Sequence, residues 1–106
     1  MSAIMVIMTH DFPTKWELEA HVKRDLEDFD RLKLKLIELG LIHAQHGILA
    51  NPQDKFRHTG IMKFKDIAAY KNCMEAFRGH DWETNNNEIT NVFRFEVYVV
   101  DYEVDV

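Results

Sequence analysis

Histidine is the residue whose type and number first suggest chemistry in this chain. Six histidines occur among the 106 residues, and imidazole is the side chain best suited to exchange a proton near neutral pH. They are His10, His21, His43, His46, His58 and His80. This excess favours histidine acid–base chemistry, provided that the fold brings some of these rings to one site.

The spacing of cysteine and histidine argues against a metal site. A single cysteine, Cys73, excludes an intramolecular disulfide and a cysteine-based zinc site, and it fits a reducing cytoplasm. His43 and His46 are three residues apart in an expected strand, so their side chains point to opposite faces and cannot share an ion. We therefore expect no metal and no cofactor.

Other polar and aromatic residues have two interpretations each. His21 and Asp25 have the i, i+4 spacing of neighbours on a helix, and we expect them to lie on its solvated face. His10 ends a strand and is placed at the mouth of a binding site. Trp16 and Trp82 stand at element ends, where they either rim the same opening or pack.

Charge and composition exclude several classes of protein. Thirteen Lys and Arg against 18 Asp and Glu give a net charge of −5, and the basic residues are scattered, so we expect no nucleic-acid partner. The apolar run before Thr9 is too short for a signal or membrane helix, and we expect a cytoplasmic protein with no membrane partner. The length predicts one domain, residues 1–106.

Six elements must position the candidate residues. A capping box, Thr14 to Glu17, and a terminal Gly40 bound a predicted helix of about 25 residues. The other elements follow from apolar runs and helical spacing: strands at 4–8, 41–49, about 57–65 and 92–100, and a helix at 66–79. This β-α-β-β-α-β order predicts a ferredoxin-like α+β fold, a four-stranded antiparallel sheet with both helices on one face. The bare face would be covered by a second copy in a homodimer, with residues 101–106 as an added edge strand.

Strand alternation assigns side chains to the two faces of the sheet. The face toward the helices is predicted to carry Phe93, Phe95, Val97, Val99, Gly60, Met62, Phe64, Ala44, His46 and Ile48. Small residues at 44 and 60 would leave a hollow, with His46 and His58 as its polar members. The alternatives are a core histidine bonded to a carbonyl for His46 and a solvated ring for His58. The other face is polar and either forms the dimer interface or lines a barrel lumen that holds the site.

One stretch resembles a known group of proteins. Residues 57–70, RHTGIMKFKDIAAY, are followed by His80 and by a last strand that ends in Asp101 and Tyr102. This pattern is similar to that of stress-responsive barrel proteins and small polyketide cyclases. These belong to the dimeric α+β barrel superfamily, together with antibiotic-biosynthesis-type monooxygenases and haem-degrading enzymes.

The resemblance implies a small-molecule cleft between helices and sheet, with His80 in the place of the cyclases' catalytic histidine. Tyr70 stands one turn before the position of the cyclase tyrosine, which falls on about Cys73. Haem-degrading members need a histidine about ten residues after an aromatic at Phe64, where this chain has Cys73 or Met74.

Together these observations predict a small cofactor-independent enzyme, of cyclase, lyase or monooxygenase type, acting on a hydrophobic aromatic or polyketide-like molecule. His80 would be the acid or base, Tyr70 a donor to a developing enolate, and His46 an orienting group. The predicted substrate-binding residues are His10, His58, Phe64, Trp82 and Trp16. The alternatives are a non-catalytic small-molecule-binding or stress-response barrel protein and, third, a haem-binding or haem-degrading protein.

Overall fold

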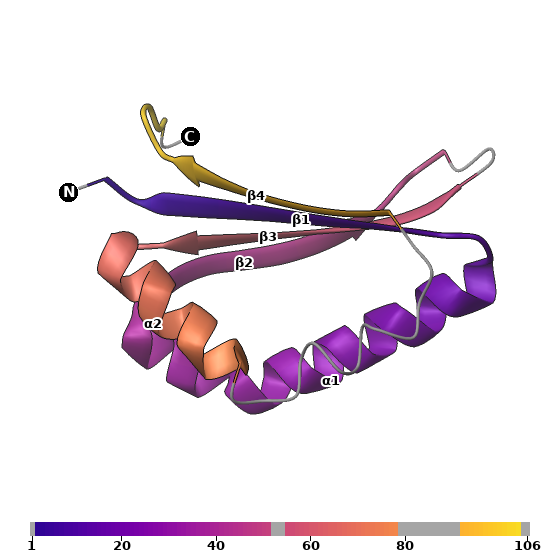
Figure 1. The fold of residues 1–106 in the computed structure, drawn as a ribbon, viewed down its shortest axis with the longest axis horizontal. Helices are drawn as coiled ribbons and strands as arrows, with labels where there is room; N and C mark the ends of the chain where they lie inside the picture. Colours follow the sequence, from indigo (N-terminus) through magenta and orange to yellow (C-terminus); the bar gives the residue numbers. More distant parts are fainter. Residues whose placement is uncertain (1, 52–54, 79–91, 105–106) are drawn as a thin grey trace.

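Two helices cover one face of a four-stranded sheet in the computed structural model, which describes residues 2–51, 55–78 and 92–104 (Figure 1). The strand order is β2-β3-β1-β4, and all neighbouring strands are antiparallel. The elements in chain order are β1 Ile4–Phe12, α1 Lys15–Leu39, β2 Leu41–Ile48, β3 Phe56–Phe64, α2 Ile67–Arg78 and β4 Val92–Val99. The predicted ferredoxin-like α+β fold is confirmed.

The first strand is longer than predicted. It ends at Phe12 rather than near residue 8. Alternation explains the difference, because His10 and Phe12 are buried beneath the helices while Thr9 and Asp11 lie on the opposite face. Polar residues therefore continue the strand here instead of ending it.

The first helix begins and ends where the sequence predicts. The Oγ1 atom of Thr14 accepts a hydrogen bond from the Glu17 amide at 3.1 Å, and the Thr14 hydroxyl donates to the Glu17 carboxylate at 3.0 Å. At the other end Gly40 has φ 116°, in the left-handed region, and its amide donates to the carbonyl of Ile37. A Cβ atom at Gly40 would lie 2.5 Å from the Cβ of Ala69, so glycine is also needed for the close approach of α2.

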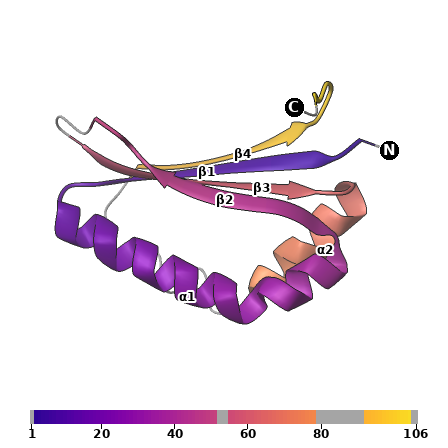
Figure 2. The same cartoon turned by 180° about the vertical axis from the view of Figure 1, so that it is seen from behind.

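The apolar core lies between the helices and strands β1, β2 and β3 (Figure 2). Its fully buried members include Val6, Leu36, Phe64 and Cys73. The predicted inward face is confirmed by the strand register, which pairs the apolar positions of β4 with those of β1. The helices pack over β1, β2 and β3. On β4, the inward-facing Phe95 is still 40% exposed.

The face of the sheet away from the helices is largely polar, as predicted, with Met5, Ile7 and Ile61 as partly buried apolar residues among the polar ones. It carries a cross-strand pair in which Arg57 donates two hydrogen bonds to Asp11, at 2.5 and 2.8 Å. The side chains of Arg94, Glu96 and Tyr98 are exposed there. In the tail, residues 101–104 form no strand in the single chain, and Glu103 pairs with Lys63 on this face.

Candidate functional site

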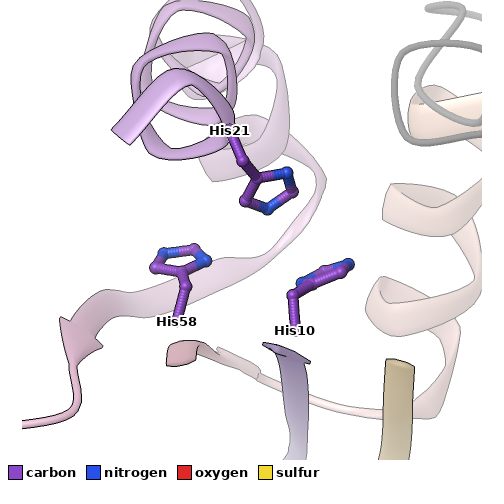
Figure 3. A group of neighbouring side chains, drawn as sticks. All are labelled: His10, His21 and His58. Carbon is purple, nitrogen blue, oxygen red and sulfur yellow. The ribbon is translucent and has the colours of Figure 1, made fainter. Parts of the chain in front are cut away.

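Three histidines from three different elements meet under one end of the sheet. His10 on β1 and His58 on β3 are directly opposite partners in the antiparallel register, so both side chains leave the sheet on the same side. His21 comes from the second turn of α1, which crosses this end of the sheet. Figure 3 shows the three rings around a common space, each turning a nitrogen toward it.

The distances within this histidine cluster, His10, His21 and His58, are short. The ring centres of His10 and His21 are 4.5 Å apart, those of His21 and His58 are 5.4 Å apart, and those of His10 and His58 are 6.5 Å apart. One nitrogen atom of each ring lies within 4.8 Å of the corresponding atoms of the other two. The three imidazoles can therefore act on a single atom between them.

Burial sets the electrostatic state of the cluster. The exposed fractions are 5% for His10, 1% for His21 and 5% for His58. Loss of solvation, together with the neighbouring His21 and His58, lowers the pKa of His10 to about 4, against the opposing effect of Asp25. Burial likewise lowers the pKa of His58 to about 4, against the opposing effect of Asp25. Both rings are therefore neutral at pH 7.

Asp25 brings a negative charge to the cluster. It lies one turn after His21 on α1, and its Oδ2 atom is 2.8 Å from Nε2 of His21 and 3.9 Å from Nδ1 of His58. Neither contact is aligned as a hydrogen bond, and within the described part of the chain these two buried nitrogen atoms have no hydrogen-bond partner. Buried polar atoms normally have one, which sets these two nitrogen atoms apart from those of an ordinary core histidine.

Two neighbours define the sides of the cluster. The Phe12 ring, 2% exposed, lies 4.8 Å from the His21 ring and closes one side with an apolar wall. The His46 ring on β2 lies 5.2 Å from that of His58, and His46 is exposed. The cluster thus meets solvent on the side of β2.

The expectation for His21 was wrong. This residue is fully buried rather than solvated, because the inward stripe of α1 contains Leu18, His21, Asp28 and Leu36. The apolar Leu26 on the same helix is 47% exposed. Polar residues in the middle of this inward stripe face the sheet. Plotting the residues by their angle around the helix axis would have placed His21 on the same side as Leu18.

The predicted catalytic residues Tyr70 and His46 do not come together. The Tyr70 ring packs edge-on against Phe64, with ring centres 5.7 Å apart. Phe64 is fully buried in the core and lies six residues along β3 from His58, which is about 20 Å. His46 lies beside His58 instead.

The remaining predicted residues are placed as follows. His10 and His58, predicted to bind substrate, both belong to the cluster. Trp16 lies in the first turn of α1 and is 75% exposed. His80 and Trp82 lie outside the described residues. At the position of the predicted hollow, Ala44 on β2 is exposed and Gly60 on β3 is half-buried.

Within the described residues, neither α1 nor α2 holds a stretch that is long and apolar enough to cross a membrane. No protein-family model matches the sequence, and no curated protein matches it.

Solved structures match the whole chain. Two dimeric ferredoxin-like proteins from uncultured marine organisms superpose with TM-scores of 0.83 and 0.81, at 16% and 20% identity. These matches cover 98% and 99% of this chain and all of the other chains. SnoaB, a cofactor-independent oxygenase from Streptomyces nogalater, is similar with a TM-score of 0.61 at 13% identity, over 98% of both chains. This chain therefore has the ferredoxin-like α+β fold of these proteins.

Proposed function

We propose that this protein is an enzyme that moves a proton on a small, largely apolar molecule, with the histidine cluster as its centre. The observation that carries the proposal is the meeting of three buried imidazoles, two of which keep a ring nitrogen without a hydrogen-bond partner in the described chain. A core histidine with a structural role would normally have both nitrogens satisfied.

The geometry supports acid–base work in particular. A general base must lie within hydrogen-bond reach of the proton that it takes. An acidic C–H placed between the rings would be near nitrogen atoms from three elements, with Asp25 beside His21 and His58 to stabilise an imidazolium. Phe12 supplies an apolar wall. We assign His46 to the solvent-exposed side, where it would contact an entering substrate.

This proposal centres the chemistry on the histidine cluster rather than on His80 and Tyr70, the residues that the resemblance implied. Proton transfer at an activated carbon is a step shared by cyclase, lyase and oxygenase reactions on aromatic or polyketide-like molecules. A similar fold in a cofactor-independent oxygenase supports a reaction carried out by side chains alone. His80 stays in the proposal as a second acid–base group. Tyr70 has no part in it, because its ring packs against Phe64, about 20 Å along β3 from His58.

A homodimer is the second part of the proposal. In the single chain the helix-free face leaves Met5, Ile7 and Ile61 only partly buried, and apolar groups on an uncovered sheet face favour a partner. The named dimers with the same fold support a second copy of this chain. We place the dimer in the cytoplasm, where Cys73 stays reduced. Sedimentation at micromolar concentration should show a dimer, and a monomer would contradict this part.

The reaction is tested by hydrogen–deuterium exchange at carbon. Apolar aromatic 1,3-diketones are incubated in D₂O with the protein, and deuterium at the central carbon is followed by NMR. We expect exchange above the buffer rate, with a loss of at least about tenfold in His58→Gln and no loss in His43→Gln, since a positioned general base contributes about 10²–10⁴-fold. Binding of the diketones without any exchange would favour the non-catalytic binding protein instead.

A further inference from the structure

We propose that His10, His21 and His58 form a site for one divalent transition-metal ion, with zinc as the ion that fits best. This goes beyond the proposed function and does not depend on it, because metal binding is measured without a substrate. With an ion in place, a metal-bound water rather than an imidazole would serve as the base in the proposed reaction.

The donor geometry is close to that of a metal site. Zinc binds histidine nitrogen at about 2.0–2.1 Å in a tetrahedral arrangement. Around such an ion the ring centres lie about 5 Å apart, and in the cluster they are 4.5, 5.4 and 6.5 Å apart. The nitrogen atoms, within 4.8 Å of one another, have to close by about 1.5 Å. Rotation of the side chains can achieve this while β1, β3 and α1 stay in place.

Two buried nitrogen atoms supply an independent observation. Nε2 of His21 and Nδ1 of His58 have no hydrogen-bond partner in the described chain, although both residues are at least nine-tenths buried. An ion between the rings would satisfy such atoms, whereas an apolar ligand would not. Asp25, with Oδ2 close to both atoms, compensates the charge of the ion. The fourth position belongs to this carboxylate or to a water molecule.

The chemistry of the donors selects the class of ion. Imidazole suits zinc, copper, nickel and iron, whereas magnesium and calcium require a shell of oxygen ligands. The one thiol of the chain, Cys73, is buried in the core and donates to the carbonyl of Leu36, so it does not belong to the cluster. The site should therefore take zinc and cobalt and refuse magnesium.

The test is a titration of the untagged, chelator-stripped protein with Co²⁺, followed by displacement with Zn²⁺. We expect the visible bands of cobalt bound to imidazole at one ion per chain, and no effect of Mg²⁺. The variants His10→Gln and His58→Gln should weaken binding at least about 100-fold, more than is typical for the loss of an outer-shell partner. His43→Gln, which removes an exposed histidine on the opposite face, is the matched control and should bind as the parent does.

A second measurement does not depend on how the variants fold. Zinc added to the parent protein should shift the imidazole NMR signals of the three cluster residues together and leave that of His43 in place. The proposal is overturned if one-to-one binding is absent, if binding survives in folded cluster variants, or if His43 is the ring that responds. None of these results depends on diketone exchange, so the two proposals fail separately.

Discussion

His10 and His58 face each other across neighbouring antiparallel strands, with ring centres 6.5 Å apart and His21 above them from the helix. A directly opposite pair on one face of a sheet is held by the backbone register rather than by the side chains. The two strands therefore fix two-thirds of the cluster before any ligand arrives, and only the ring of His21 depends on the docking of α1.

Gly40 should be sensitive to the addition of a single methyl group. Gly40→Ala would place a side chain in the left-handed region and against Ala69, and we expect a loss of about 2 kcal/mol or more in the free energy of unfolding. Gly47→Ala is the matched control, because no atom lies within 4 Å of its added Cβ. Urea denaturation measures the free energy of unfolding of both variants. Equal values would contradict the conclusion that α1 needs a glycine at position 40.

The helix cap at Thr14 gives a second test. Thr14→Ala removes the acceptor for the Glu17 amide and should cost about 1 kcal/mol in the free energy of unfolding. Thr14→Ser keeps a hydroxyl of the same reach and should restore most of this loss. A serine variant as unstable as the alanine variant would show that the capping bond contributes little.

Stability of the metal-free protein should fall in acid. The pKa of His10 and of His58 is about 4 in the folded chain, against 6.5 when unfolded. The unfolded chain therefore binds more protons between these values, so stability is full above about pH 6.5 and decreases as the pH falls toward 4.

The pH dependence of the free energy of unfolding can be measured by urea denaturation in the presence of a chelator. We expect a loss of about 4 kcal/mol between pH 7 and pH 4.5 from these two rings together. Replacing His58 with phenylalanine should flatten the dependence. An unchanged slope in that variant would show that His58 titrates normally.

Asp25 is expected to tune metal affinity. Asp25→Asn removes the charge beside His21 and His58, and zinc affinity should fall by about 10- to 100-fold. Asp30→Asn removes a carboxylate from the exposed side of the same helix and should leave the affinity unchanged. Calorimetric titration with zinc compares the two, and equal affinities would remove Asp25 from the site.

The fold could be predicted from the sequence because its determinants are local. Thr14 and Gly40 bound the long helix, and alternation from Phe93 to Val99 defines the last strand and its faces. These patterns act over a few residues, so they are visible without tertiary information.

The site was harder to predict because it depends on contacts between distant elements. His10 and His58 are 48 positions apart and meet only through the β1–β3 register. His21 resembles a surface residue beside Asp25, and only the packing of α1 on the sheet buries it. Sequence spacing only relates residues within one helix or strand, whereas each histidine of this cluster comes from a different element.

The central claim is that His10, His21 and His58 enclose one common binding point. Crystals soaked in zinc and measured at the zinc absorption edge test this claim most directly. We predict a single strong anomalous peak between the three rings, within bonding distance of one nitrogen of each. The absence of a peak there, or peaks only at exposed histidines such as His43, would contradict the account.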